Sequence, residues 1–165
     1  MSDVHTGGCQ CGAIRFRVSG PLGKASICHC RMCQKAFGGF YAPLVGVANE
    51  ADLVWTRAEP KRFHSSNVVA RGFCPECGTP LTYEAPDGVA LAIGAFDDPS
   101  AISPVIQYGV EGKLPYADHM ADIPARTTED DFGTLAFLAS IVSNQHPDHD
   151  TDTWPPVQPG ETDNG

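Results

Sequence analysis

The chain has 165 residues, of which 42% are hydrophobic and 8% aromatic, a composition typical of one folded domain with a modest core. Its longest apolar stretch, residues 135–142, is far shorter than the ~20 residues that a membrane-spanning helix needs, so no membrane partner is expected. The formal charge is −9, which argues against a nucleic-acid partner, because zinc modules that bind nucleic acid usually present a basic face.

Short β-strands dominate the pattern along the chain. Ile14, Phe16 and Val18 alternate with polar side chains, the period-two signature of a half-buried strand. Further strands are predicted at residues 40–47, 53–56, 68–73, 81–84 and 89–93, with turn signals rich in Gly, Pro and Asp between them. The sequence therefore predicts a mainly β domain over residues 1–126.

One helix is expected after this domain, over residues 127–145. Thr128 and Asp131 have the character of a capping box, and acidic residues in a first turn complement the helix dipole. Apolar side chains then occur nearly all round the helix, so it should be covered on more than one side. A second protomer is the expected cover, which predicts a homodimer.

The last twenty residues, 146–165, contain five acidic residues, four prolines and no Lys or Arg. Because they contribute −5 to the net charge of −9, the rest of the chain carries −4. Such a composition buries too little apolar surface to offset the entropy of ordering, so a disordered acidic tail is predicted here. His146 and His149 are interpreted as solvated residues of this tail.

The seven cysteines fall in three tight clusters: Cys9 with Cys11, Cys28 with Cys30 and Cys33, and Cys74 with Cys77. Their odd number, their close spacing and the lack of an apolar signal segment after Met1 argue against disulfides and predict a cytoplasmic protein. The spacing suits zinc, which takes four thiolates in a closed structural site. Seven ligands therefore fill one site and leave a second with three ligands and an open position.

The Cys-Pro-Glu-Cys motif at residues 74–77 is typical of a zinc knuckle, with Gly78 expected at a positive φ just past the second ligand. A redox-active pair would instead need a thioredoxin-like βαβ setting, and the flanks here are predicted strands. The knuckle needs two further ligands, for which the first two cysteines of the chain are the natural complement. Spacing alone leaves open a pairing with Cys30 and Cys33 instead.

Four motifs stand in order along the chain: Gly8-Cys-Gln-Cys-Gly12, Cys28-His-Cys-Arg-Met-Cys33, Arg71-Gly-Phe-Cys-Pro-Glu-Cys-Gly-Thr-Pro-Leu81 and Gly94-Ala-Phe-Asp-Asp-Pro99. This series resembles the glutathione-dependent formaldehyde-activating enzyme family, which shares a domain with centromere protein V. The resemblance implies a β-tent of small antiparallel sheets organised around cysteine zinc knuckles. It also implies a structural zinc on Cys9, Cys11, Cys74 and Cys77, and a labile zinc at the glutathione site on Cys28, Cys30 and Cys33.

The founding activity of that family joins formaldehyde to the thiol of glutathione, a carbon-sulfur lyase reaction that gives S-hydroxymethylglutathione. The resemblance thus implies a zinc lyase whose partners are a small thiol and a small aldehyde. Cys28, Cys30 and Cys33 are expected to be catalytic, because zinc with an open position lowers the pKa of a bound thiol. Arg31 and Lys35 are predicted to bind carboxylates of the thiol substrate.

Three positions and one alternative function complete these expectations. His29 lies between two ligands and is expected to point away from the metal. Gln107 and Tyr116 stand where the family often has His and Trp, so substrate contacts there should differ. The alternative function is a non-catalytic zinc-binding module that recognises a protein partner through the apolar helix and sheet faces.

Overall fold

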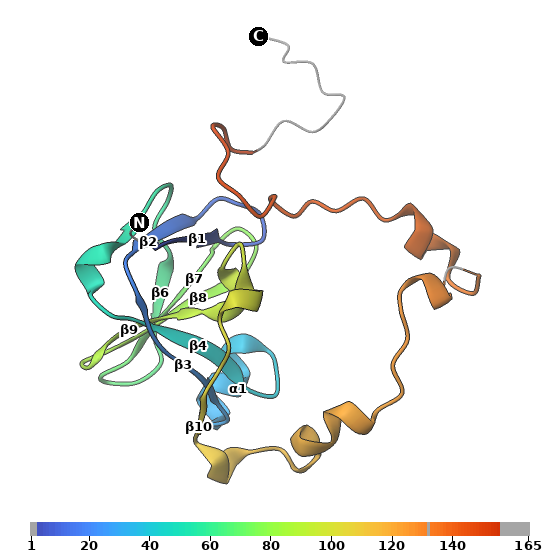
Figure 1. The fold of residues 1–165 in the computed structure, drawn as a ribbon, viewed down its shortest axis with the longest axis horizontal. Coiled ribbons are helices and arrows are strands. Elements are labelled where there is room, and N and C mark those ends of the chain that lie inside the picture. Colours follow the sequence, from blue (N-terminus) through green and yellow to red (C-terminus); the bar gives the residue numbers. More distant parts are fainter. Residues whose placement is uncertain (1–2, 132, 156–165) are drawn as a thin grey trace. The chain divides into compact units, whose positions relative to one another are not determined.

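Two β-sheets are the main regular structure in the computed structural model, which describes residues 3–131 and 133–155 (Figure 1). The smaller sheet is antiparallel, with the order β1-β2-β5. Its strands are β1 (Val4–Gly8), β2 (Arg15–Ser19) and β5 (Leu53–Trp55). The mainly β prediction is confirmed.

The larger sheet has the order β10-β3-β4-β9-β8-β7-β6. Its strands are β3 (Leu22–Cys28), β4 (Ala42–Val47), β6 (Lys61–His64), β7 (Ala70–Phe73), β8 (Pro80–Ala85), β9 (Gly88–Ala92) and β10 (Ile106–Tyr108). Neighbouring strands are antiparallel except β10, which runs parallel to β3. Each of the six predicted strands therefore has a counterpart, and β1, β3, β6 and β10 are additional.

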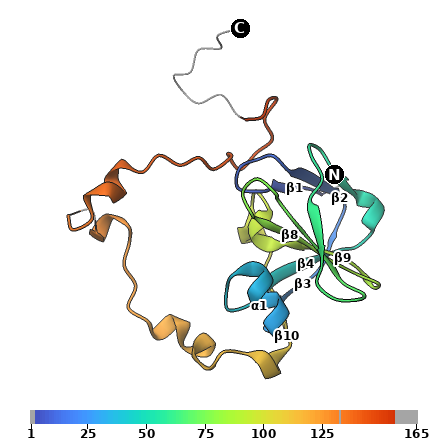
Figure 2. The ribbon, with the colours of Figure 1, turned by 180° about the vertical axis from the view of Figure 1, so that it is seen from behind.

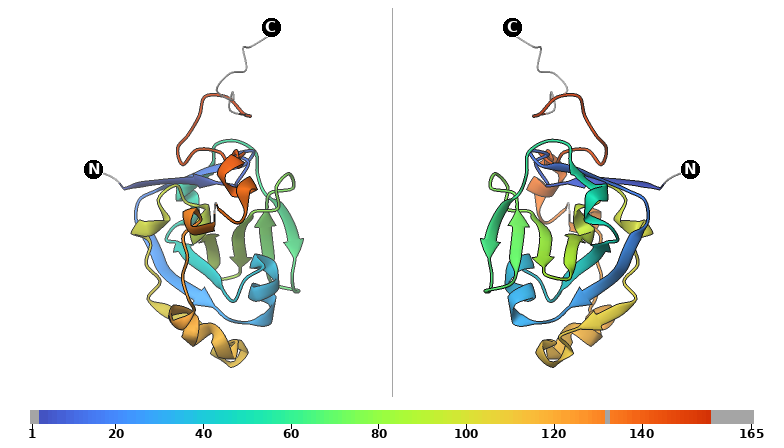
Figure 3. Two further views of the ribbon diagram at one scale, coloured as in Figure 1. Left: turned by 90° about the vertical axis from the view of Figure 1, so that its right-hand side faces the viewer. Right: turned by 90° about the vertical axis from the view of Figure 1, so that its left-hand side faces the viewer.

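A short helix, α1 (Arg31–Phe37), packs at the far end of the larger sheet from the β1–β2 pair (Figure 3). The Cys30 side chain accepts a hydrogen bond from the N–H of Cys33 at its start, and Gly38 ends it in the left-handed conformation. The buried Gln34 amide donates to the carbonyls of His29 and Gly112. Short 3₁₀ turns occur at Glu50–Asp52, Ile93–Ala95, Pro99–Ala101 and Val110–Gly112.

The main core joins the two sheets. Phe16 of β2 is fully buried and makes edge-to-face ring contacts with Phe96, at a centroid distance of 5.1 Å, and with Trp55, at 6.0 Å. Leu81 of β8 and Leu91 of β9 are fully buried in the same cluster. The buried apolar face predicted for β2 is thus confirmed at Phe16 and Val18, and this face holds the smaller sheet on the larger one, although Arg15 on the other face is also buried.

A buried ion pair lies at the edge of this core. Arg15 has only 3% of its surface exposed, and its two terminal nitrogens donate to the carboxylate of Asp97 at 2.7 and 2.6 Å. Asp97 also accepts a bond from the Thr6 hydroxyl at 2.6 Å, and Arg15 donates further to Asp150 at 2.8 and 2.9 Å. Burial alone would raise the pKa of Asp97, but the bonds from Arg15 and Thr6 outweigh it and lower that pKa.

Residues 145–155, here called the C-terminal strap, pack against the β1–β2 end of the fold (Figure 2). The N–H of His146 donates to the carbonyl of Gln10 at 2.7 Å, and the Trp154 indole donates to the carbonyl of Cys11 at 2.7 Å. The buried His146 ring lies so close to Gly12, which has a φ of +79°, that a side chain at that glycine would collide with it. The prediction of disorder is therefore wrong for residues 146–155, because tertiary contacts order them, and residues 156–165 lie outside the described chain.

The strap belongs to the same compact unit as the residues up to Lys113, whereas Leu114–Asn144 form a second unit. The second unit contains 3₁₀ turns at Pro115–Asp122, Glu129–Asp131 and Ala136–Ser140, so the continuous helix expected over 127–145 is wrong for the residues described there. An isolated helix of this length is marginal in water without tertiary packing, and Phe137 and Val142 remain 62% and 78% exposed. The homodimer stays a prediction.

No helix in the described part of the chain is long and apolar enough to cross a membrane.

A substitution at Asp97 tests how much the buried Arg15–Asp97 ion pair stabilises the fold. Asp97→Asn should lower the free energy of unfolding by about 3 kcal/mol, because it leaves the buried Arg15 charge poorly compensated. Urea unfolding of both proteins at neutral pH measures the difference.

The stability that Asp97 contributes should also depend on pH. Because the folded-state pKa of Asp97 is lowered, this contribution is present above the unfolded pKa of about 3.9 and is lost as pH falls through the folded value.

Asp98→Asn is the matched control for this substitution. Asp98 is exposed and its carboxylate accepts a bond from the nearby Ser100 hydroxyl, so its change should stay within about 0.5 kcal/mol. Equal effects of the two substitutions would contradict the role given to the buried pair.

The strap gives a second test. A chain that ends at Asn144 loses the bonds donated by His146 and Trp154 and the bonds that Asp150 accepts from Arg15, so its free energy of unfolding should fall by about 1–2 kcal/mol. A chain that ends at Pro155 keeps all of these contacts and serves as the control. If urea unfolding finds both truncated chains as stable as the full chain, the strap contributes nothing to the fold.

Candidate metal centres

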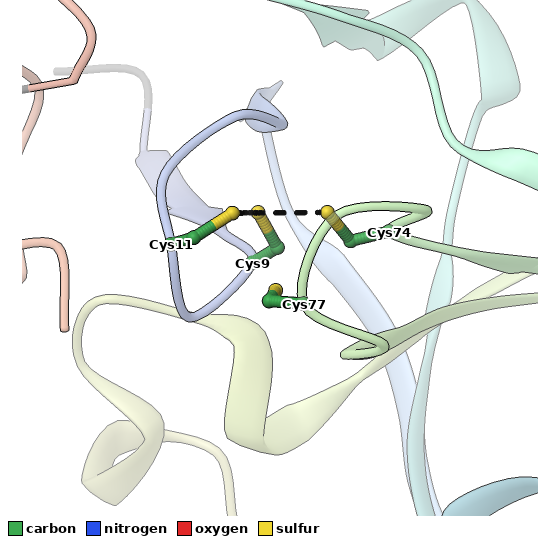
Figure 4. A group of neighbouring side chains, drawn as sticks. All are labelled: Cys9, Cys11, Cys74 and Cys77. Carbon is green, nitrogen blue, oxygen red and sulfur yellow. Dashed lines mark hydrogen bonds between the residues drawn. The ribbon is translucent and has the colours of Figure 1, made fainter. Parts of the chain in front are cut away.

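Four cysteine side chains converge from two loops that are distant in sequence (Figure 4). Cys9 and Cys11 lie in the loop between β1 and β2, and Cys74 and Cys77 lie in the turn between β7 and β8. Their sulfur atoms are all within 4.8 Å of one another. The structure thus groups the knuckle with the first two cysteines, and the alternative pairing with Cys30 and Cys33 is not formed.

The sulfur positions fit a tetrahedral ion. Sγ of Cys11 lies 3.6 Å from Sγ of Cys9 and 3.9 Å from Sγ of Cys74. Four sulfurs at about 2.3 Å from a central zinc would be about 3.8 Å apart, so little rearrangement is needed. Gly78 has a φ of +79°, as expected for the residue that follows the knuckle.

Burial and hydrogen bonding act in opposite directions on these thiols. Burial raises the pKa of Cys9, although the Ile14 N–H donates to its sulfur at 3.3 Å. Burial also opposes ionisation of Cys77, but hydrogen bonds with the hydroxyl and backbone N–H of Thr79 outweigh it and lower the pKa of Cys77 to about 6. A bound divalent cation would favour the thiolate form at all four positions.

The other three cysteines form a separate cluster, here called the trio, of Cys28, Cys30 and Cys33. Cys28 ends β3, Cys30 caps α1 and Cys33 lies in its first turn, which brings three sulfurs within 4.8 Å. The parallel pairing of Tyr108 with Cys28 fixes the end of β3. No fourth His, Cys or carboxylate joins this group among the residues that the structure describes.

The trio thiols differ in ionisation. Burial raises the pKa of Cys33 to about 12, even though the guanidinium of Arg71 lowers it. For Cys30 burial again opposes ionisation, but the N–H of Cys33 and the neighbouring thiols prevail and lower its pKa. Three converging thiols are ligands of the kind that zinc takes in proteins, and hydrogen bonds to their sulfurs orient such ligands, so the residues fit the metal.

A cavity of about 420 Å³ opens beside the trio and is lined by all three of its cysteines. Met32, Tyr83 and Tyr108 contribute larger side chains to its wall. The charged residues that line it are Lys24, Arg71 and Asp87. The geometry thus combines a three-sulfur donor set with a pocket large enough for a small ligand.

The two residues predicted to bind carboxylates of the substrate, Arg31 and Lys35, do not line this cavity. Arg31 and Lys35 are exposed on α1, and Arg31 donates instead to the Gln34 side chain at 3.2 Å. Their role in binding stays a prediction. His29 is 1% exposed, its Nε2 lies 2.9 Å from Oε1 of Gln107, and neither of its ring nitrogens joins the three-sulfur group, which agrees with the expectation that it is not a ligand.

Sequence reasoning assigned no role to Arg71, whose guanidinium reaches the trio. Its Nη2 donates to Sγ of Cys33 at 3.4 Å. The available signal was a charged residue within the predicted strand at 68–73, just before the knuckle. Alternation alone does not show whether such a residue faces solvent or a second cluster.

Two comparisons with known proteins point to one enzyme family. The family model described as glutathione-dependent formaldehyde-activating enzyme matches residues 4–111. A Halomonas elongata protein, whose name places it among these enzymes, is 36% identical over 84 residues. That match covers 46% of this chain and 52% of the relative, so the chain spans about half of the relative's length.

A crystal structure of a Rhodobacter sphaeroides protein aligns with a TM-score of 0.47 and 19% identity, over 62% of this chain and 98% of that one. Likeness at this level carries no argument about the site. The family match is different, because residues 4–111 are more than half of the chain and include all seven cysteines. The chain belongs to the glutathione-dependent formaldehyde-activating enzyme family.

Proposed function

We propose that this protein is a cytoplasmic zinc-dependent carbon-sulfur lyase that adds a glutathione-like thiol to a small aldehyde such as formaldehyde, or releases it. The family match supports the thiol and the aldehyde as substrates. The observation that carries the proposal is the trio, three converging sulfurs with no fourth protein ligand among the described residues, at the wall of a cavity. A purely structural zinc would have four protein ligands.

Two metals are part of the proposal. The cluster of Cys9, Cys11, Cys74 and Cys77 would hold a structural zinc, and the trio would hold a labile one. Zinc in the trio would supply a Lewis acid that favours the thiolate form of a substrate thiol. Three thiolates leave such a site with a net charge of −1 and one position for an outside ligand.

The reaction needs little beyond positioning. The substrate sulfur, having lost its proton to water, attacks the carbonyl carbon and forms the carbon-sulfur bond. The carbonyl π electrons move to oxygen, which takes a proton from water, and the reverse steps release the aldehyde. The trio and the walls formed by Met32 and Tyr108 would hold the thiol so that only its sulfur meets the aldehyde.

The two metals should differ in what their loss does. Cys77→Ser should give an insoluble or unfolded protein, because the four-sulfur cluster joins residues 63 apart in sequence, Cys11 and Cys74, and a structural zinc supplies about 10 kcal/mol or more of folding free energy. Cys30→Ser should stay folded, because the trio is local to β3 and α1. Circular dichroism and elemental analysis of zinc distinguish the two outcomes.

Mild chelation of the native protein provides the matching measurement. It should remove the trio metal first and leave the secondary structure unchanged. Equal loss of metal and of fold in both variants would contradict this division between a structural and a labile site.

Catalysis should be measured as exchange, because thiols add to formaldehyde without an enzyme. The native protein should accelerate exchange between free formaldehyde and S-hydroxymethylglutathione at equilibrium, as followed by NMR exchange spectroscopy. Cys30→Ser should lower that acceleration at least about a hundredfold, since the trio would lose a ligand. An exchange rate that the native protein leaves unchanged would favour the alternative of a non-catalytic zinc module.

A further inference from the structure

Arg71 is held beside the trio by contacts from three directions. Its Nε donates to the Ser65 hydroxyl at 3.1 Å, and its Nη2 donates to Sγ of Cys33 at 3.4 Å. Its guanidinium carbon lies 5.1 Å from the centre of the Tyr83 ring, in cation–π geometry. A long side chain fixed in this way keeps its positive charge at one place in the wall of the cavity.

One nitrogen of this guanidinium remains without a partner. Arg71 is only 7% exposed. Its Nη1 is buried and has no hydrogen-bond partner among the described residues. A buried cation normally has its donors satisfied, because each unpaired N–H loses hydration without compensation. The unused donor indicates that Arg71 has capacity for a further anionic partner.

The charges that line the cavity favour the same conclusion. Lys24 and Asp87 offset each other, so Arg71 supplies the remaining positive charge. With zinc in the trio the three thiolates would leave −1, and Arg71 brings the sum to zero. The thiolate of the substrate, a fourth anionic sulfur, would then enter a neutral site, whereas without Arg71 it would meet a negative one.

The four-sulfur cluster differs from the trio because no charged side chain bonds to its sulfurs among the residues that the structure describes. Its sulfurs interact with uncharged groups, the N–H of Ile14 and the hydroxyl of Thr79, whereas Cys33 of the trio accepts from a guanidinium. A closed site has no incoming anion to accommodate. The basic partner thus stands at the cluster that has three protein ligands and a cavity.

We propose that Arg71 is the residue that makes the trio pocket select an anionic sulfur ligand, the thiolate of the substrate, over the corresponding thioether. Arg71 acts through its charge at Cys33 and its unpaired Nη1, so it is a positioning residue and not a reacting group. This inference rests on the thiol site proposed above, but it concerns binding and requires no turnover.

Calorimetry without formaldehyde tests the inference on the zinc-loaded protein. Arg71→Met keeps a side chain of similar length over Tyr83 but removes the charge, so the dissociation constant for glutathione should rise about tenfold to a hundredfold. Binding of S-methylglutathione, which has no thiolate, should change little. The pH at which glutathione binding is half complete should move upward in the variant, because loss of the Arg71 charge disfavours the bound thiolate and raises the pKa of the thiol. A merely structural role would not move it.

Arg62→Met is the matched control, since Arg62 lies on the neighbouring strand β6, is exposed and does not line the cavity. It should bind glutathione as the native protein does. Arg71→Lys keeps the charge and should retain the preference for glutathione over S-methylglutathione, with part of the affinity. Zinc content and circular dichroism are measured for every variant.

Three results would overturn the inference. The first is that the Arg71→Met variant keeps its zinc and binds glutathione as tightly as the native protein does. Another is native protein that binds glutathione and S-methylglutathione equally, which decides the matter even if Arg71→Met does not fold. The third is a folded, zinc-loaded Arg71→Lys without the preference. Formaldehyde exchange is measured separately, so a failure of catalysis with these binding results intact would count against the proposed function alone.

Discussion

The convergence of four sulfur atoms from two separate loops is the constraint on which the rest of the fold depends. The loop between β1 and β2 belongs to the smaller sheet, and the turn between β7 and β8 belongs to the larger one, so this cluster ties the two sheets together. Without a metal these four sulfurs would not ionise together, because burial raises the pKa of Cys9 and Cys11 and disfavours their thiolate forms. A shared cation resolves that conflict, which is why the geometry and the proposed metal support each other.

The C-terminal strap also packs against the loop that carries two of these sulfurs. His146 and Trp154 bond to the carbonyls of Gln10 and Cys11, the backbone of the loop that presents two of the sulfurs. Arg15, which directly follows this loop, bonds both to Asp150 of the strap and to Asp97. The strap is thereby fixed against one short loop, and the shape of that loop depends on Gly12 having no side chain.

Sequence patterns predicted the parts of the fold that depend on local periodicity or on ligand spacing. The strands with one buried face, such as β2, were found from alternation, and the three cysteine clusters were found from spacing. β6 was missed because all of its residues are exposed and it has no apolar face, and β1 ends in two glycines that weaken any strand signal. The order in residues 146–155 was missed because the contacts that create it come from residues over 85 positions away, such as Arg57.

The candidate site shows the same division between local and distant information. The trio was predictable because its ligands lie within one short segment, whereas Arg71 reaches it from a strand that pairs with β6 and β8. β7 also leads directly into Cys74, so a single strand carries both the basic residue of the pocket and a ligand of the four-sulfur cluster. Disruption of that cluster would displace β7 and with it the guanidinium beside Cys33. Loss of the trio metal would change only the local ends of β3 and α1, so the dependence runs from the structural cluster to the pocket and not in the other direction.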